Sequence, residues 1–370
     1  MAERIKNIMI LLLTGTFIMT MLIFQVFSHD KKLSDTERRA LQSMPKVNAE
    51  TIKSGSFMKD FETYTQDQFP FRDTFRRIKV QSALNLFRQK EVHDLYLYEG
   101  YITKMEYPEN QAMLKYAAER FKNIYEVYLK DTEVQIFSSI VPDKNYFLGP
   151  QSGHLAMDYD QFIEDFKTLT DYMKYIDIRA QLSITDYYYT DTHWRQEALI
   201  PVAQELGKAM HTPVLNEDDY EMKTYDKPFY GVYAGQLGLP VVPDTINYLT
   251  NQMLEQCVVT SYDTGKPVVR PMYNFEKASG RDAYELFLSG SDALLTIENP
   301  NAATDKELVL FRDSFGSSIA PLLVGGYQKV TLVDMRYINS ALIGKFIDFK
   351  DQDVLFLYST LVLNNSMSLK

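Results

Sequence analysis

The sequence predicts an α/β fold in which a parallel sheet carries helices on both faces. The main observation is a regular alternation of strand and helix patterns near the carboxyl end, which is typical of such sheets. There we expect strands at 307–311, 329–334 and 354–358, separated by helices at 316–324 and 338–349. A second observation is an uncharged apolar segment near the amino end, which predicts one transmembrane helix before the folded body.

The amino-terminal segment has the length and composition of a single membrane anchor. Residues 8–27 contain no charged side chain and are mostly Ile, Leu, Met, Phe and Val. About 20 such residues span a lipid bilayer as a helix. Arg4 and Lys6 precede the segment and no good cleavage site follows it, so we expect an uncleaved anchor in the cell membrane with the body outside. The alternative is a buried core helix, which suits a terminal segment that is apolar all round less well.

Composition divides the chain into three expected regions. These are an anchor over residues 1–30, a polar juxtamembrane stalk over 31–56 and an extracytoplasmic body over 57–370. The formal net charge of −10 excludes a nucleic acid as an expected partner. Cys257 is the only cysteine, so the sequence predicts no intramolecular disulfide and no cysteine-based metal site.

The body shows further elements before the alternating carboxyl-terminal part. Apolar residues recur at helical spacing over 57–87, with a break at Pro70. We then expect a hairpin at 94–103, helices at 109–130, 158–175 and 195–210, and strands at 134–141 and 176–184. Residues 212–274 are rich in Pro, Gly, Tyr and Asn, and predict loops and short strands that cover one face of the core.

Ser314 falls where open α/β sheets bind their ligands. The apolar run 308–311 predicts a central strand and Gly316 begins a predicted helix, so Ser314 lies at the carboxyl end of the strand. The free N–H groups and the dipole of a helix start can stabilise an oxyanion formed when Ser314 attacks a carbonyl. The alternative is that Ser314 is only a helix N-cap, because serine is favoured there.

Asp191 and His193 can supply the base that a serine nucleophile requires. They lie two residues apart in Tyr-Tyr-Thr-Asp-Thr-His-Trp, residues 188–194. In an extended segment their side chains point the same way. Asp191 can then accept the Nδ1–H of His193 and leave Nε2 free to act as base. The alternatives are a structural histidine or a metal pair, although no further ligand cluster accompanies these two residues.

The two motifs resemble those of the SGNH-hydrolase-like proteins of bacterial exopolysaccharide O-acetylation, of which the alginate acetylation proteins are the best known. Asp191-Thr-His-Trp194 and Arg312-Asp-Ser-Phe315 carry the resemblance, which is greatest to the Gram-positive DHHW proteins and spans roughly residues 57–363. Further segments that support it are 69–73, 141–144, 229–231, 299–302 and 333–337.

The resemblance implies a three-layer α/β/α sandwich with Ser314 as nucleophile, His193 as base and Asp191 as orienting acid. It implies a membrane-anchored serine acyltransferase that O-acetylates a cell-surface or exported polysaccharide and needs no metal or organic cofactor. The acetyl donor would be passed across the membrane by a membrane-bound O-acyltransferase partner. Arg312 departs from the usual glycine, and Thr192 replaces the second residue of the DHHW motif, which is not a triad position.

Three further residues are candidates for substrate binding. Trp194 is the only tryptophan and either forms a wall of the acceptor site or packs the motif in place. Lys144 and Arg336 could bind substrate anions, or they could form salt bridges at strand ends. Two other functions also fit the sequence: a carbohydrate acetyl-esterase that uses the same triad with water as acceptor, and a non-catalytic polysaccharide-binding envelope protein.

Overall fold

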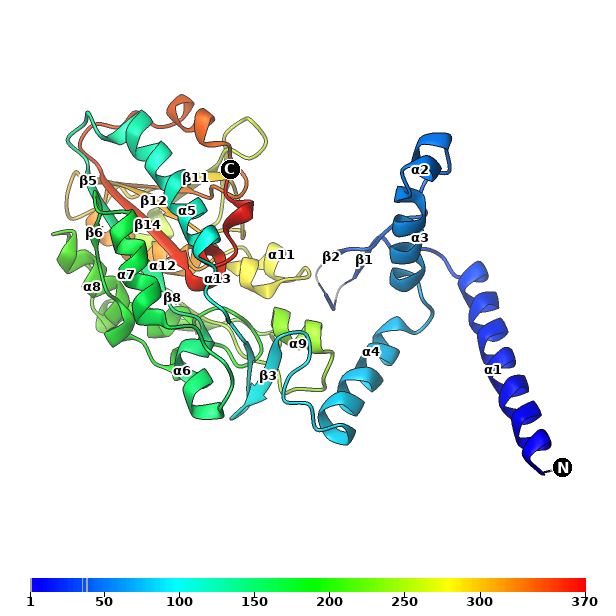
Figure 1. The fold of residues 1–370 in the computed structure, drawn as a ribbon. Helices are drawn as coiled ribbons and strands as arrows, with labels where there is room; N and C mark the ends of the chain where they lie inside the picture. Colours follow the sequence, from blue (N-terminus) through cyan, green and yellow to red (C-terminus); the bar gives the residue numbers. More distant parts are fainter. Residues whose placement is uncertain (1, 35, 38) are drawn as a thin grey trace. The chain divides into compact units, whose positions relative to one another are not determined.

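The computed structural model describes residues 2–34, 36–37 and 39–370, and the chain forms two compact units. Unit 1 comprises Met1–His93 with Ala234–Pro240, and unit 2 comprises Asp94–Tyr233 with Val241–Lys370. Figure 1 shows the two units as ribbons. The boundary predicted between residues 56 and 57 does not coincide with this division, because the helices expected over 57–87 belong to unit 1.

Unit 1 begins with helix α1, Ala2–Phe27, which is long and apolar enough to cross a membrane. At 1.5 Å per residue its 26 residues extend about 39 Å, beyond the roughly 30 Å of a bilayer's hydrocarbon core. None of its described residues is buried, so α1 is not a core helix. The remaining elements of unit 1 are β1 Leu33–Ser34, β2 Arg39–Ala40, α2 Ala49–Lys53, α3 Ser56–Asp67, α4 Arg72–Gln81 and a π-helical turn Ser82–Leu86.

Ion pairs hold the short elements of unit 1 together. Asp67, at the end of α3, accepts hydrogen bonds from Nη1 and Nη2 of Arg39, at 2.9 and 2.5 Å. Glu37 pairs with Arg72 at 2.7 Å and with Arg76 at 3.2 Å. The hydrogen bonds from Arg39 hold the pKa of the Asp67 carboxyl below its usual value. The break predicted at Pro70 separates α3 from α4, as expected.

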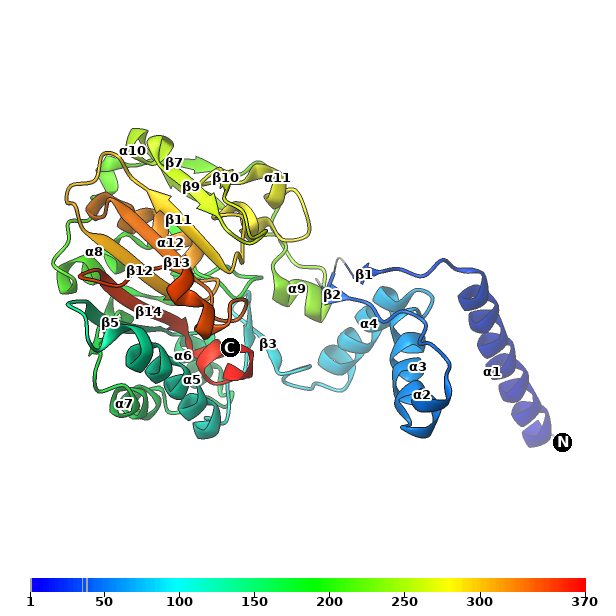
Figure 2. The same ribbon diagram turned by 90° about the horizontal axis from the view of Figure 1, so that it is seen from above.

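Unit 2 is built on an eight-stranded sheet with the strand order β10-β9-β11-β13-β12-β14-β5-β6. Figure 2 shows most of these strands side by side. The five strands from β13 to β6 run parallel, whereas β11, β9 and β10 add an antiparallel extension. The strands are β5 Gln135–Val141, β6 Lys174–Tyr175, β9 Val258–Ser261, β10 Val268–Arg270, β11 Leu294–Glu298, β12 Glu307–Arg312, β13 Lys329–Val333 and β14 Asp353–Ser359.

Helices cover both faces of the parallel part, so the predicted three-layer sandwich is confirmed. Successive side chains of β12 point to opposite faces. Leu308 and Leu310 join a first core with α8, Ile200–Ala209, and α12, Gly316–Leu323. Residues 309 and 311 join a second core with α5, Gln111–Ile124, and α7, Tyr159–Leu169.

Shorter elements surround this sandwich. The hairpin predicted over 94–103 is formed by β3 and β4. The region 212–274 holds short elements, as predicted, but two of its strands, β9 and β10, extend the sheet. The shorter elements are β3 Leu95–Tyr98, β4 Tyr101–Lys104, α6 Lys144–Ser152, β7 Glu221–Thr224, α9 Val232–Leu237, β8 Asn247–Thr250, α10 Gln252–Gln256, α11 Phe275–Ala278 and α13 Thr360–Leu363.

Two predicted elements are wrong. The strand expected over 176–184 is a loop with 3-10 turns, because Asp177 binds the backbone N–H and guanidinium of Arg179 and turns the chain away from the sheet. The helix expected over 338–349 is only a 3-10 turn, Ser340–Lys345. Its buried apolar residues lie at 338, 343, 347 and 349, a spacing that does not fit one helical face, and Gly344 disfavours a helix further.

Leu310 offers a test of the first core. It is fully buried in β12, so Leu310→Ala should lower the free energy of unfolding by about 2–5 kcal/mol. Leu155→Ala is the matched control, because Leu155 is 55% exposed, and it should change stability by less than about 1 kcal/mol. Chemical denaturation of the full chain in detergent measures both. Equal losses would contradict this assignment of the core.

Candidate active site

A tight hairpin carries the Asp-x-His motif. Tyr187 and Trp194 pair in an antiparallel bridge, and the N–H of Tyr188 donates to the carbonyl oxygen of His193 at 3.1 Å. The carboxylate of Asp244 holds the hairpin tip by accepting the N–H groups of Tyr189 and Thr190 at 2.8 and 2.7 Å. The tip is thereby fixed by a residue from a separate loop.

The segment around Gly231 braces the hairpin from a second side. The N–H of Gly231 donates to Thr190 Oγ1 at 2.8 Å, and the N–H of Val232 donates to Asp191 Oδ2 at 2.8 Å. A Cβ at position 231 would overlap the backbone of Thr190 and Asp191, so only glycine permits this approach. Val232 thus binds one oxygen of Asp191, Oδ2, while the imidazole contacts the other, Oδ1.

Asp191, His193 and Ser314 form a continuous hydrogen-bonded relay. Asp191 Oδ1 lies 2.5 Å from His193 Nδ1 and also accepts the backbone N–H of His193 at 3.1 Å. His193 Nε2 lies 2.7 Å from Ser314 Oγ. Asp191 is fully buried and His193 is 7% exposed, whereas Ser314 is half-buried and can be reached from solvent. These are the distances and roles that a nucleophile, a base and an orienting acid require.

Ser314 lies at the carboxyl end of β12, in the middle of the sheet. From β12 the chain crosses through α12 to β13 on one side, and then returns to β14 on the other side of β12. Such a reversal of strand order is where open α/β sheets bind ligands. Asp313 fixes the turn, because its Oδ1 accepts the N–H of Phe315 at 3.0 Å and its Oδ2 accepts the Ser359 hydroxyl at 2.6 Å.

The start of α12 offers fewer free N–H groups than the sequence suggested. The N–H of Gly316 donates to the Asp313 carbonyl at 3.1 Å, and the N–H of Ser317 donates to the Ser314 carbonyl at 3.2 Å. The N–H of Phe315 is bound to Asp313. Within the described part of the chain, the N–H of Ser314 itself makes no such bond. The first turn of α12 therefore has few free N–H groups to offer to an oxyanion, and the N–H of Ser314 is the remaining candidate.

Two aromatic rings contact the imidazole. The ring of Tyr284 stacks on His193 with 3.8 Å between ring centroids and 7° between planes, and the ring of Phe315 lies 4.9 Å away at a tilt of 53°. Tyr284 is fixed in turn, because its hydroxyl donates to Ser318 Oγ at 2.8 Å. The imidazole can thus keep one orientation while it gains and loses a proton.

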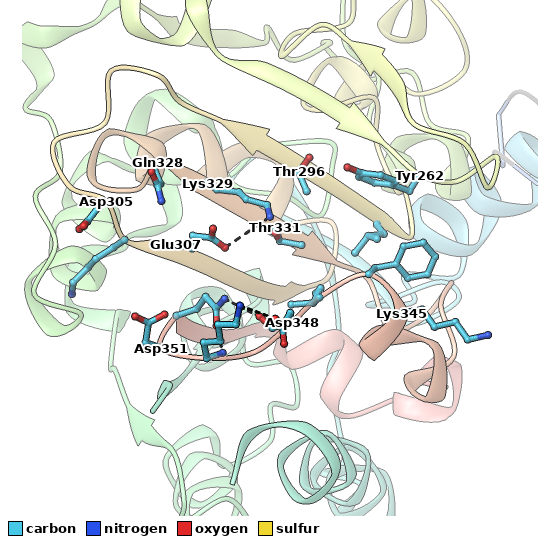
Figure 3. Close-up of a pocket in the computed structure, with 16 residues that line it drawn as sticks. Tyr262, Thr296, Asp305, Glu307, Gln328, Lys329, Thr331, Lys345, Asp348 and Asp351 are labelled. Atoms are coloured by element: carbon cyan, nitrogen blue, oxygen red, sulfur yellow. Dashed lines mark hydrogen bonds and ion pairs between the residues drawn. The ribbon is translucent and has the colours of Figure 1, made fainter. Parts of the chain in front are cut away.

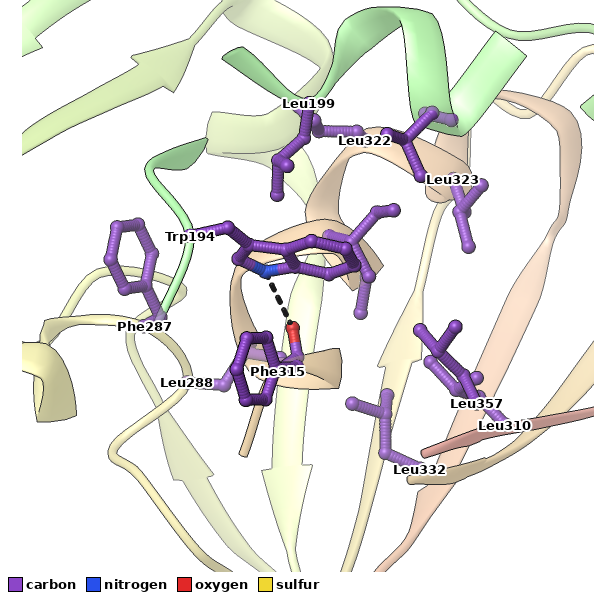
Figure 4. Packing of buried hydrophobic residues seen from close by; sticks show 14 of the residues in the cluster. Trp194, Leu199, Phe287, Leu288, Leu310, Phe315, Leu322, Leu323, Leu332 and Leu357 are labelled. Atoms are coloured by element: carbon purple, nitrogen blue, oxygen red, sulfur yellow. Dashed lines mark hydrogen bonds between the residues drawn. The ribbon is translucent and has the colours of Figure 1, made fainter. Parts of the chain in front are cut away.

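Trp194 serves packing and not substrate binding. The indole is fully buried in the first core, and its Nε1–H is shared between the Phe315 carbonyl at 3.2 Å and Ser318 Oγ at 2.9 Å. Figure 4 shows the ring enclosed by leucine and phenylalanine side chains, with the bond to Phe315 drawn. The indole therefore lies where the packing alternative would place it, and it presents no open surface.

Lys144 lies beneath the hairpin and also contacts protein groups. Its Nζ donates to the carbonyl oxygens of Tyr188 at 2.9 Å and Tyr189 at 3.3 Å, and lies 5.2 Å from the ring centroid of Tyr233. The side chain is buried, and this burial lowers the pKa of Lys144 to about 7. The structure gives Lys144 a supporting position under the hairpin and does not place it at an open surface.

Arg336 lies at the end of β13 in the salt bridge that was the alternative to substrate binding. It donates from Nε and Nη2 to the two oxygens of Asp334, at 2.9 and 2.6 Å. Arg312, fully buried one strand away, lies 3.5 Å from the same carboxylate and donates to the Gly290 carbonyl at 3.2 Å. Arg312, which stands where the resemblance expects glycine, thus ties β12 to a neighbouring turn.

That turn is strained and abuts the start of α12. Leu288, Ser289 and Gly290 have φ values of 54°, 65° and 90°, a left-handed run that costs free energy for the two residues that are not glycine. The Gly290 carbonyl also accepts the hydroxyl of Ser317 at 3.3 Å. Strain of this kind persists only where surrounding contacts fix the backbone, and here Arg312 and Ser317 supply them.

Sequence reasoning missed Asp244 and Tyr284. Asp244 lies in a loop and Tyr284 in a short 3-10 turn, Ala283–Leu286, and a single aspartate or tyrosine carries no local signal of a contact with a distant hairpin. Gly231 lies in one of the segments that support the family resemblance. A glycine next to two aromatic residues can indicate that another part of the backbone approaches closely. Among the residues that the structure describes, no group of three or more His, Cys, Asp or Glu is arranged to hold a metal ion.

Comparisons with solved structures place the fold among known ones. A DHHW family protein from Eubacterium siraeum is 20% identical with a TM-score of 0.60, and the match covers 74% of this chain and 93% of that one. PatB1 from Bacillus cereus is 17% identical with a TM-score of 0.59, covering 73% and 96%. A structure of PatB1 with a sulfonyl adduct matches at 16% identity with a TM-score of 0.57. Scans of family models and curated proteins find no match. The resemblance to DHHW proteins is thus confirmed for the fold.

The buried amine of Lys144 predicts a pH-dependent stability. Above pH 7 folded Lys144 is mostly neutral while the unfolded lysine keeps its proton until about pH 10.4, so the unfolded state binds more protons and stability rises with pH. Relative to Lys144→Met, the wild-type free energy of unfolding should increase by about 1 kcal/mol per pH unit between pH 8 and 10.

Denaturation of both proteins across this pH range measures the difference. Lys167→Met is the matched control, since that lysine side chain is 41% exposed on α7. The difference in free energy of unfolding between wild type and Lys167→Met should not change with pH. If the difference between wild type and Lys144→Met does not change either, Lys144 is not a buried amine with a lowered pKa.

Proposed function

We propose that this chain is a membrane-anchored, extracytoplasmic serine acyltransferase that O-acetylates a cell-surface or exported polysaccharide. The observation that carries the proposal is the relay from Asp191 through His193 to Ser314, with distances of 2.5 and 2.7 Å. A buried acid, an oriented imidazole and a solvent-accessible hydroxyl together form an activated nucleophile. The position of Ser314 at the strand-order reversal of the sheet supports the same function.

In the first half of the reaction, Ser314 Oγ attacks the carbonyl carbon of the acetyl donor while His193 Nε2 takes the hydroxyl proton. Asp191 Oδ1 holds the Nδ1–H and stabilises the imidazolium, and the ring face of Tyr284 adds a favourable contact with the cation. The N–H of Ser314 can donate to the oxyanion of the tetrahedral intermediate. His193 then returns the proton to the departing group, which leaves acetyl-Ser314.

In the second half, a sugar hydroxyl takes the place of the departed group. His193 Nε2 accepts the proton of that hydroxyl, whose oxygen attacks the acyl carbon of acetyl-Ser314. Collapse of the second tetrahedral intermediate breaks the bond to Ser314 Oγ, and the imidazolium returns its proton to that oxygen. The enzyme is regenerated and the sugar carries an acetate ester, so atoms and protons balance without a further reactant.

The acyl group, the acceptor and the location follow from other features of the chain. The resemblance of its motifs to exopolysaccharide O-acetylation proteins favours acetyl and polysaccharide. The length of α1, with Arg4 and Lys6 before its apolar run, favours a single-pass anchor with unit 2 outside the membrane. A donor outside the cell then has to come through a membrane protein, for which a membrane-bound O-acyltransferase is the partner class.

Acyl transfer can be tested directly with the full chain in detergent. An activated aryl acetate is supplied with and without an oligosaccharide acceptor, and the sugar is examined by mass spectrometry. The proposal expects acetylated sugar and an acetyl adduct on Ser314. Ser314→Ala should lower turnover by about 10³-fold or more, whereas Ser368→Ala, an exposed serine far along the chain, should leave it unchanged.

Three outcomes of this test contradict the proposal. Release of acetate to water with no acetylated sugar would identify an esterase that uses the same three residues. Turnover that survives Ser314→Ala would exclude Ser314 as the nucleophile. Absence of turnover in both proteins would leave a non-catalytic polysaccharide-binding protein as the better description of this fold.

Tyr284 separates ring stacking from hydrogen bonding. Tyr284→Phe keeps the ring on the imidazole and loses the bond to Ser318, so acetyl transfer should fall by no more than a few-fold. Tyr284→Leu removes the aromatic face and should lower kcat by about ten-fold, a cost typical of a lost cation–π contact, with little change in KM. Steady-state kinetics of both variants measure this split. Equal losses would show that the ring face does not assist His193.

A further inference from the structure

Unit 2 contains a groove beside the start of β12, whereas Ser314 of the candidate active site follows the end of that strand. The segment 338–349 does not form the long helix expected of it, so the face of β11 and β13 that points toward the second core is only partly covered. The groove lies between these strands, the start of β12 and the segment 345–352 (Figure 3), and encloses about 720 Å³. That volume lies within the range of small-molecule sites, roughly 300–1,000 Å³.

The floor of the groove carries hydroxyl groups where a covered sheet would carry apolar side chains. Thr296 of β11 and Thr331 of β13 are direct cross-strand partners and both line the groove. Thr296 is only 6% exposed, and within the described residues its Oγ1 has no hydrogen-bond partner. The oxygen is itself covered by protein atoms, so the two threonines make the floor polar without offering Oγ1 of Thr296 to a ligand.

The charges around the groove cancel. Four lysines and four carboxylates line it, and two of the pairs are in contact: Lys329 with Glu307 at 3.9 Å and Lys350 with Asp348 at 2.8 Å. A balanced lining does not attract a polyanion such as nucleic acid, but it presents donors and acceptors side by side. The four lysines are Lys306, Lys329, Lys345 and Lys350, and the four carboxylates are Asp305, Glu307, Asp348 and Asp351.

One end of the groove is aromatic. The rings of Tyr262 and Phe346 lie 6.3 Å apart between centroids, inclined at 59°, and both line the groove. Phe346 is 49% exposed, so its ring is open to a ligand. A ligand that fits this surface has many hydroxyl groups, no net charge and an apolar face that can lie on an aromatic ring. Those properties belong together in neutral sugars.

We propose that this groove is a second, non-catalytic binding site for a neutral segment of oligosaccharide. The identity of its occupant as the acceptor polymer rests on the proposed function. Glu307, at the start of β12, lines the groove, and Ser314 follows the other end of that strand, roughly 20 Å away at about 3.3 Å per residue. A polymer held in the groove raises the effective concentration of its neighbouring residues near the nucleophile.

Binding can be measured without turnover in the full-length Ser314→Ala protein. Isothermal titration calorimetry with neutral hexasaccharides, cellohexaose and chitohexaose, should detect binding by at least one of them. Addition of Phe346→Ala should weaken it about three- to ten-fold through loss of the ring contact. Tyr262→Leu, which removes the second ring at the aromatic end, should weaken it by a similar factor. Phe275→Ala is the matched control, because Phe275 is 47% exposed and lies outside the groove.

The outcomes separate this inference from the proposed function. Binding that is weakened by Phe346→Ala and by Tyr262→Leu, but not by Phe275→Ala, supports the groove, whether or not the intact protein transfers acetyl. No binding of either sugar, or binding that both groove variants leave unchanged, overturns it, even if transfer occurs. A concentration-dependent dimer that Phe346→Ala disrupts, in a protein that binds neither sugar, would assign the groove to a second copy of the chain instead.

A kinetic readout applies if transfer is established. Groove variants should raise KM for a long polysaccharide acceptor about three- to ten-fold and leave KM for a monosaccharide and the value of kcat unchanged. Equal changes for long and short acceptors would show that the groove does not hold polymer during transfer.

Discussion

The candidate site depends on one long-range contact, the 2.7 Å hydrogen bond between His193 Nε2 and Ser314 Oγ, which joins residues 121 positions apart in the chain. Neither partner is fixed by its own element alone. Asp313 ties the turn that bears the serine to Ser359 at the end of β14, and Asp244 ties the hairpin that bears the histidine to a separate loop. The hydrogen bond between His193 and Ser314 therefore depends on the folded unit as a whole, because contacts away from the two side chains set the distance between them.

Buried charge is the unusual feature of these supports. Asp313, Arg312, Asp334 and Lys144 are almost completely buried, and each would be costly without partners. The partners are present: Asp313 accepts from Ser359 and Phe315, Arg312 and Arg336 share Asp334, and Lys144 donates to the hairpin backbone. Such networks add little net stability, but removing one member leaves the others unpaired, which penalises any other arrangement of the strand ends.

The central part of the fold could be predicted because its signals are local. The strands β12 and β14 contain continuous apolar runs, β5 and β13 are mostly apolar, and strand–helix–strand alternation places Ser314 at a strand end. The spacing of Asp191 and His193 was visible as well. What could not be read locally were the contacts between loops, such as Asp244 on the hairpin and Tyr284 on the imidazole, since they follow no period. The helix predicted over 338–349 does not form, because the apolar residues of that segment face the second core without forming a helical stripe.

The sequence also left open choices that only burial could decide. Trp194 next to the histidine fitted either a substrate wall or a packing role, and the position of its indole in the first core decides for packing. Lys144 and Arg336 were ambiguous for the same reason, because a cation near a strand end suits an anion of any origin. Their partners in the structure are a backbone and a carboxylate of the chain itself.

His193 is only 7% exposed and its ring contacts Tyr284 and Phe315, whereas Ser314, which faces Nε2, is half-buried and can be reached from solvent. A molecule that exchanges a proton with Nε2 therefore has to approach beside Ser314 Oγ. If Ser314 carries an acyl group, as proposed, the lifetime of that ester depends on whether water or a sugar hydroxyl reaches this position first.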